Sequence, residues 1–203
     1  MIHWNDKESL TTIQTALDQD KIVLASGDTV LGLWGKLTQK SFEVLNELKQ
    51  RSDKPYLIVV GSAQKIKLFI DQPLSEKLET LIATCWPGPV TLIFKARSDL
   101  PSWMVSQDRT IALRVPDHAG LLHLLKHCDG LFSTSANVHG LPVPESISAV
   151  DQSLIDKVAV VCLDRDHETY GQSPSTILDC STGDIRVVRP GAFSIDVLHN
   201  LIG

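Results

Sequence analysis

Residues 48–55 read Leu48-Lys49-Gln50-Arg51-Ser52-Asp53-Lys54-Pro55 and place three cations within six residues, directly after an apolar run of helical spacing. Lys49 and Arg51 would diverge on a continuous helix, but at a helix end that runs into a turn both can reach one ligand. Arginine offers a planar fork of donors and lysine a movable point charge, a pair suited to a polyphosphate. The alternative is a solvated helix end whose cations complement the helix dipole, and on this stretch alone the alternative is favoured.

A second polar cluster shifts that balance toward an anion site. Ser133-Thr134-Ser135-Ala136-Asn137 follows the short apolar run Leu131-Phe132 and precedes Gly140. Hydroxyls, an amide and accessible backbone N–H groups after a strand can satisfy several phosphate oxygens. The alternative here is a Ser/Thr-rich turn or helix cap, which is common in α/β proteins.

Five motifs along the chain occur in a characteristic order. They are Lys49-x-Arg51, Trp86-Pro87-Gly88-Pro89-Val90-Thr91, Ser135-x-Asn137, Pro174-Ser175-Thr176-Ile177 and Arg189-Pro190-Gly191. In this order they resemble the YrdC-like threonylcarbamoyl-AMP synthase family. The resemblance implies one α/β domain over residues 1–203, in the family's short form. It also implies a twisted sheet, mixed or mostly parallel, flanked by helices and bearing an open concave ligand groove.

The segment Ser26-Gly27-Asp28-Thr29-Val30-Leu31-Gly32-Leu33 corresponds to a substrate motif of that family, but it diverges from the usual pattern. Ser26 and Gly27 stand where proline and threonine are usual, and Leu31 replaces an aromatic residue. A lost hydroxyl and a lost aromatic wall can change which amino acid fits, or whether one fits at all. The segment follows a predicted buried strand at residues 21–25, and strand ends are common ligand sites in α/β proteins.

Arg114 lies inside the predicted strand at residues 110–115, between apolar neighbours. Alternation puts its side chain on the same face as Ala112. Such an arginine must reach solvent or find an anion, because an unpaired buried charge is costly. From the residues both outcomes stay open. In the family the equivalent arginine of an Arg-Val-Pro motif contacts the carboxylate of the amino-acid substrate, and Arg114-Val115-Pro116 keeps that motif intact.

The resemblance also implies a role for each candidate site residue. The expected catalytic residues are Lys49 and Arg51. The expected contacts to L-threonine are Thr29 and Arg114. The expected contacts to ATP are Lys49, Arg51, Lys54, Ser133, Ser135, Asn137, Ser175 and Arg189.

The reaction implied by the resemblance joins L-threonine and bicarbonate into a carbamate, whose oxygen attacks the α-phosphate of ATP and releases pyrophosphate. Mg²⁺ is expected on the phosphates, without a dedicated protein site. His123 and His127 have a spacing that can bind metal, but no third ligand is near them in sequence and we expect no metal site there. The product would feed downstream enzymes that modify tRNA.

Composition and charge limit what we expect for RNA binding, for the state of the cysteines and for localisation. The chain has 203 residues, 43% of them hydrophobic, and a formal charge of −5, so any binding of tRNA or double-stranded RNA needs a local basic groove. The alternative function is a paralogue that binds RNA or a nucleotide without making threonylcarbamoyl-AMP. The four cysteines form no C-x-x-C pair and are expected to be reduced. Without a signal peptide or membrane-spanning run, a cytoplasmic protein without membrane contact is expected.

Local signals predict several element boundaries. A capping box of Asn5 and Glu8 should open a first helix that runs to about Gln19. Thr38 should cap the helix that delivers Lys49. Trp86 should plug the core rather than stack on a base. Further strands are expected at residues 56–60, 90–94, 158–163 and 185–188.

Overall fold

A ten-stranded sheet runs along the long axis of the computed structural model, which describes residues 1–51, 54–165, 169–171 and 173–202. The strand order is β1-β8-β2-β3-β7-β4-β6-β5-β9-β10. The strands are β1 (Ile2–His3), β2 (Val23–Ala25), β3 (Gly32–Lys36), β4 (Leu57–Val59), β5 (Val90–Lys95), β6 (Thr110–Arg114), β7 (Leu131–Ser135), β8 (Val160–Leu163), β9 (Thr176–Asp179) and β10 (Arg186–Arg189).

The sheet is mixed, as predicted, and parallel pairing does not dominate it. Strands β1–β8, β2–β8, β4–β6 and β5–β9 pair in parallel. Strands β2–β3, β3–β7, β4–β7, β5–β6 and β9–β10 pair antiparallel. The predicted elements omitted β3, which turns back antiparallel on β2 and then pairs antiparallel with β7.

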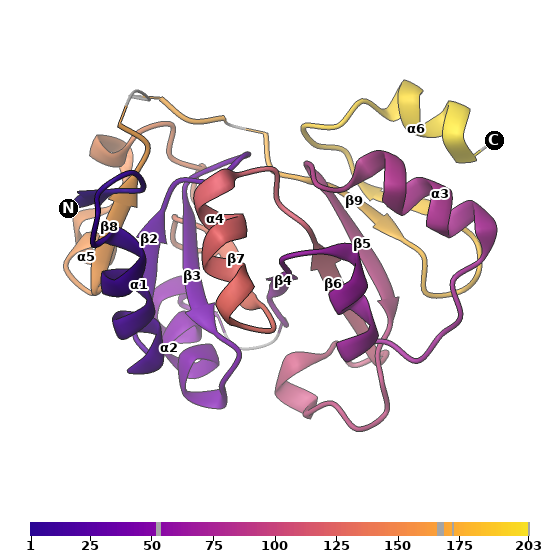
Figure 1. Cartoon of the computed structure of the whole chain (residues 1–203), viewed down its shortest axis with the longest axis horizontal. Coiled ribbons are helices and arrows are strands. Elements are labelled where there is room, and N and C mark those ends of the chain that lie inside the picture. The colour runs from indigo at the N-terminus through magenta and orange to yellow at the C-terminus, as the bar shows by residue number, and fades with distance from the viewer. Residues whose placement is uncertain (52–53, 166–168, 172, 203) are drawn as a thin grey trace.

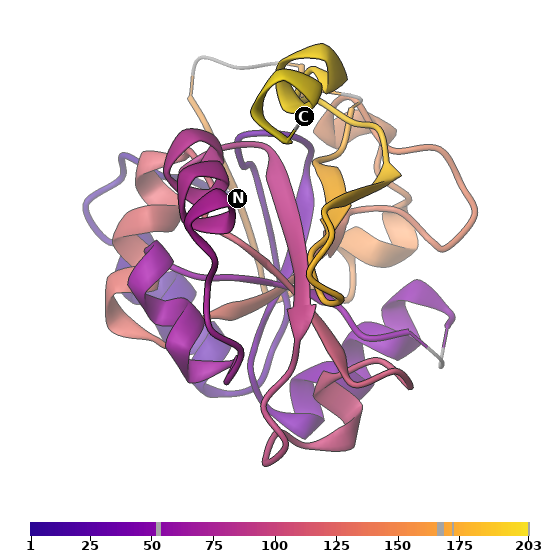
Figure 2. The ribbon, with the colours of Figure 1, turned by 90° about the vertical axis from the view of Figure 1, so that its right-hand side faces the viewer.

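The helices lie on both sides of this sheet (Figure 1). They are α1 (Ser9–Asp18), α2 (Gln39–Lys49), α3 (Glu76–Cys85), α4 (Ala119–Leu124), α5 (Gln152–Ile155) and α6 (Ile195–Ile202), with 3₁₀ turns at Ala63–Leu68, Ser102–Met104, Leu125–His127 and Ile147–Ala149. The chain begins at one end of the long axis and finishes at the other (Figure 1). At the second end α6 packs against α3 (Figure 2).

Alternation along the strands divides the core into two layers. On one face Leu24, Leu33 and Phe132 pack with Leu45 and Leu48 of α2. The opposite face packs against α1 and α4 through Val23, Trp34, Val59, Leu131, Ile13, Leu121 and Leu124. Because α1 and α4 cover only part of this second face, the rest of it is available as the floor of a pocket.

Two of the three boundary predictions are confirmed and one is wrong. The Thr38 side chain accepts a hydrogen bond from the Ser41 N–H and so caps α2. Trp86 is buried, and its ring packs edge-on against Phe94. The capping box is wrong, since α1 begins at Ser9 without a side-chain cap. A turn in which Asp6 accepts from the His3 N–H occupies the segment that would have formed it.

Each of the four cysteines is a free thiol, as predicted. Cys85, Cys162 and Cys180 are buried and Cys128 is partly exposed. Within the described residues, no helix has both the length and the apolar character needed to span a bilayer.

Candidate functional site

A pocket of about 390 Å³ lies on the sheet face that α1 and α4 leave open. Its floor crosses six neighbouring strands, since alternate residues of a strand point to the same side. The floor residues are Gly32 and Trp34 of β3, Ser133 and Ser135 of β7, Leu57 of β4, Ala112 and Arg114 of β6, Thr91 of β5 and Ile177 of β9. The site is therefore assembled from segments far apart in sequence.

All predicted site residues except Lys54 line this pocket. Lys54 is exposed and lines a neighbouring depression with Phe42, Trp103 and Arg109. The two depressions share Pro55 in their walls. The structure thus brings Lys49 and Arg51 together with the hydroxyl cluster but leaves Lys54 outside. Residues 52 and 53 of the same loop lie outside the described residues.

Lys49 stands at the carboxyl end of α2, where Gln50 adopts a left-handed conformation (φ 51°) and ends the helix. Its side chain is only 3% exposed. Its ammonium donates to the Ser135 carbonyl at 2.7 Å, to the Asn137 side-chain Oδ1 at 2.9 Å and to the Asn137 carbonyl. Burial, followed by the nearby Arg51 charge, lowers the pKa of Lys49 to about 8.

Arg51 lies on the same wall, with its guanidinium carbon 4.3 Å from the centre of the Tyr56 ring. Such stacking holds the planar group in place. Its Nη2 approaches the Lys54 carbonyl only at 3.5 Å. Its Nε is buried and has no hydrogen-bond partner among the described residues. Among the described residues, the terminal Nη groups of Arg51 therefore have donor capacity beyond the contact to Lys54.

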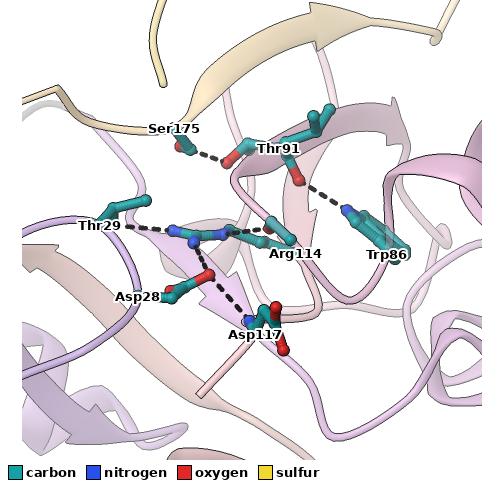
Figure 3. A network of polar contacts seen from close by, with 9 residues as sticks. Asp28, Thr29, Trp86, Thr91, Arg114, Asp117 and Ser175 are labelled. Atoms are coloured by element: carbon teal, nitrogen blue, oxygen red, sulfur yellow. Dashed lines mark hydrogen bonds and ion pairs between the residues drawn. The ribbon is translucent and has the colours of Figure 1, made fainter. Parts of the chain in front are cut away.

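Arg114 occupies the other side of the pocket floor and is held on three sides (Figure 3). Its Nε donates to the Gly88 carbonyl at 2.9 Å and its Nη1 to the Thr29 hydroxyl at 3.1 Å. Its Nη2 forms an ion pair with Asp28, which also accepts the Asp117 N–H at 2.8 Å. Burial lowers the pKa of Arg114, and Asp28 opposes that shift. The anion that the strand pattern required is thus supplied within the chain.

The hydroxyl residues of the site form two groups. Ser133, Ser135 and Asn137 line one wall, where the Ser135 hydroxyl donates to Asn137 Oδ1 at 2.5 Å. On the other side, Ser175 shares a 2.7 Å hydrogen bond with Thr91 (Figure 3). Arg189 donates to the Ser175 carbonyl at 2.7 Å, and burial lowers the pKa of Arg189.

The pocket is strongly cationic although the whole chain carries a formal charge of −5. Its described lining residues include Lys49, Arg51, Arg114 and Arg189 but no Asp or Glu. No group of three or more His, Cys, Asp or Glu among the described residues is placed to hold a metal ion. The lining thus provides donors for an anion and only hydroxyl, amide and carbonyl oxygens for a cation.

Twelve described lining residues were not among the predicted site residues, and they include three with polar side-chain groups, Trp34, Thr91 and His139. Trp34 belongs to β3, and its indole lies against Gly32, where an added Cβ would come within 2.8 Å of the ring. Thr91 lies inside one of the five motifs, so the motif could have identified it as a site residue. His139 lies in the loop after β7, and nothing in its local sequence marks it.

Comparison with known proteins gives consistent matches. The Sua5_yciO_yrdC family model, described as "Telomere recombination", matches residues 15–191. A threonylcarbamoyl-AMP synthase of Klebsiella pneumoniae is 37% identical over 145 residues, which is 70% of this chain and 74% of that protein. A threonylcarbamoyl-AMP synthase of Photorhabdus laumondii is 30% identical over 178 residues, which is 86% of this chain and 93% of that protein.

The fold is similar to that of Sua5 from P. abyssi, solved in complex with L-threonine. The two structures superpose with a TM-score of 0.86 at 24% identity, over 98% of this chain. This chain spans 58% of the length of that Sua5 chain. At this identity the superposition shows the shared fold.

Proposed function

The chain belongs to the Sua5, YciO and YrdC family, and from that premise we propose that it makes L-threonylcarbamoyladenylate from L-threonine, bicarbonate and ATP, with release of pyrophosphate. The relatives named above as threonylcarbamoyl-AMP synthases support this activity. The observation that carries the proposal is the pocket itself, where four cations, of which Arg114 is paired with Asp28, face two groups of hydroxyls and no described lining residue is Asp or Glu.

The nucleotide occupies the side lined by Arg51 and the residues after β7. Arg51 donates to the phosphates through its terminal Nη groups, for which the described residues record only the long 3.5 Å approach to the Lys54 carbonyl. Ser133, Ser135 and Asn137 contact the phosphates through short polar side chains. Ser175 and Arg189 hold the far side of the nucleotide.

L-Threonine binds where Arg114 and Thr29 meet. An arginine that donates one N–H each to Thr29, Asp28 and Gly88 still has one N–H on each terminal nitrogen, which suits one carboxylate. Because Asp28 and Thr29 fix the guanidinium before the substrate arrives, little ordering is left to occur on binding. The divergent residues Ser26, Gly27 and Leu31 do not line the pocket, and Ser26 and Leu31 are fully buried. They therefore act on amino-acid choice only through the placement of Asp28 and Thr29.

The chemistry requires positioning rather than a covalent intermediate. The site holds the amino acid and the phosphates in one pocket, so that the carbamate oxygen meets the α-phosphate at close range. Fixed cations then stabilise the charge that develops on the phosphate oxygens. Mg²⁺ carried by ATP would neutralise further phosphate charge. The described lining offers it only uncharged oxygens, such as the Ser133 and Ser135 hydroxyls, which fits an ion held mainly by the nucleotide.

The product is consumed by enzymes that modify tRNA in the cytoplasm. A reactive mixed anhydride of this kind needs an acceptor close by, so direct contact with tRNA or with a downstream enzyme belongs to the same proposal.

The test is pyrophosphate release by the purified protein with ATP, Mg²⁺ and bicarbonate, comparing L-threonine, L-serine and no amino acid. Release that depends on both threonine and bicarbonate is the expected result. ATP binding without turnover would instead favour a paralogue that binds nucleotide or RNA. If the ligand were RNA, its affinity would fall steeply with salt because phosphate contacts release counterions.

A further inference from the structure

The Lys49 ammonium is fully used by the protein's own oxygens. A lysine ammonium has three N–H donors. In Lys49 these three face the Ser135 carbonyl, the Asn137 carbonyl and the Asn137 side-chain oxygen. The side chain is only 3% exposed, so its ammonium faces the protein rather than solvent. In this arrangement no Lys49 donor remains for a phosphate.

The oxygens that Lys49 holds belong to one short loop, residues 135–141. The Asn137 side chain links Lys49 to the end of the loop, because its Nδ2 donates to the Leu141 carbonyl at 2.5 Å. The Lys49 backbone carbonyl accepts the His139 N–H at 3.1 Å. One residue at the end of α2 therefore fixes the loop through its side chain and its backbone.

Arg51, two residues after Lys49, does not hold the loop. Its Nε has no hydrogen-bond partner among the described residues, and it makes no hydrogen bond to residues 135–141 that the structure records. The two cations of the Lys49-x-Arg51 motif thus differ in where their donors point. The Lys49 ammonium faces three protein oxygens, whereas among the described residues the Arg51 Nη2 approaches only the Lys54 carbonyl, at 3.5 Å.

We propose that Lys49 is a positioning residue that holds the Ser135–Leu141 loop in its binding geometry, and that it does not contact the substrate phosphates itself. Ser135 and Asn137 present their polar groups to the nucleotide only while Lys49 holds their carbonyls. The identity of the ligand rests on the proposed function. The positioning role itself can be measured in the ligand-free protein.

The experiment is residue-resolved amide hydrogen exchange of the ligand-free Lys49→Met variant. The reporters are the amides of Asn137 and Leu141, which donate within the loop, and the amide of His139, which donates to the Lys49 carbonyl. Exchange at these three amides should accelerate by at least about tenfold, since a hydrogen bond to a charged group contributes about 1.5–3 kcal/mol. Exchange at Leu24 and Ile58, in central strands, should not change.

Arg51→Met is the matched control. It removes the neighbouring cation of the same motif and should leave ligand-free exchange of the loop unchanged while weakening ATP binding. Unchanged loop exchange in Lys49→Met, together with lost ATP binding, would overturn the proposal and make Lys49 a direct phosphate contact.

Equal acceleration in the loop and the central strands would also overturn the proposal, because Lys49 would then support the whole fold. If Lys49→Met does not fold, Lys49→Gln retains two N–H donors and should show a smaller acceleration confined to the same amides. Failure of the pyrophosphate assay would refute the proposed function but would not alter this exchange measurement.

Discussion

The cations on the two sides of the pocket differ in whether a carboxylate pairs with them. Arg114 is paired with a buried carboxylate of its own chain, whereas the Lys49 and Arg51 side has no Asp or Glu among its described lining residues. A paired arginine is fixed before a ligand binds, at the cost of part of its attraction for that ligand. Unpaired cations keep that attraction and make the empty site less stable. The difference fits a small zwitterion on one side and a polyanion on the other.

The largest effect on the free energy of unfolding should come from removing the Arg114–Asp28 ion pair. Arg114→Met leaves Asp28 nearly buried with the Asp117 N–H as its one recorded partner, and should lower the free energy of unfolding by about 3–5 kcal/mol in urea titrations. The double variant Asp28→Asn/Arg114→Met should recover part of this loss, because no uncompensated charge remains. A loss below about 1 kcal/mol in the single variant would show that the pair is not desolvated.

Arg51→Ala tests the unpaired side and should separate stability from function. Its free energy of unfolding should change by less than about 1 kcal/mol, because no buried partner loses its counter-charge. The value of kcat/KM for ATP should fall about 10- to 100-fold, the size expected for one charge-assisted contact to phosphate. Lys40→Ala, which removes an exposed cation of the same helix, is the control. Unchanged ATP affinity and turnover in Arg51→Ala would remove Arg51 from the site.

The pH dependence of the free energy of unfolding should also reveal the titration of Lys49, which has no carboxylate partner among the described lining residues. Burial lowers the Lys49 pKa from 10.5 to about 8, so between these values the unfolded chain binds more protons than the folded one. The contribution of Lys49 to the free energy of unfolding should therefore rise with pH, by up to about 1.4 kcal/mol per unit. Urea titrations of wild type and Lys49→Met at pH about 8 and about 9 measure the difference. Parallel curves would mean that Lys49 keeps an ordinary pKa.

The smallest expected effect concerns the helix that carries the unpaired cations. Thr38→Ala removes the cap of α2 and the hydrogen bond from Thr38 to Asp20, and should cost about 1 kcal/mol of stability. Thr80→Ala in α3 is the control, since that hydroxyl only bonds back to Glu76 within an exposed helix surface. Equal melting temperatures for wild type and Thr38→Ala would show that the cap is dispensable.

Local signals predicted where the candidate anion-binding residues lie along the chain. The family resemblance was needed to place four more residues in one site with them: Thr29, Arg114, Ser175 and Arg189. Thr38 marks where α2 begins, and the cation-rich turn after it marks where it ends, so the position of Lys49 and Arg51 followed from the sequence. The Ser133–Asn137 cluster was predictable because it follows an apolar strand. Strand alternation placed Arg114 on the same face as Ala112, and the resemblance rather than alternation identified that face as the site.

What local signals could not predict is which groups bond to one another. Asp28 reaches Arg114 across 86 residues, and Lys49 reaches Asn137 across 88. Strand β3 escaped prediction for a related reason. Its sequence, Gly-Leu-Trp-Gly-Lys, has weak strand propensity, and it is held in place by pairing with β2 on one side and β7 on the other.

The strand order has a consequence for how the protein is made. Both β1 and β2 pair in parallel with β8, so the first strands must wait for residues 160–163 to leave the ribosome. The pocket needs Arg189 as well, and it is therefore completed only when nearly the whole chain has emerged. Until then β1 has no partner strand and β2 is paired only with β3, so one edge of β2 stays open, and such edges promote aggregation. For this topology, the interval between the synthesis of β2 and that of β8 is when a nascent chain most needs a chaperone.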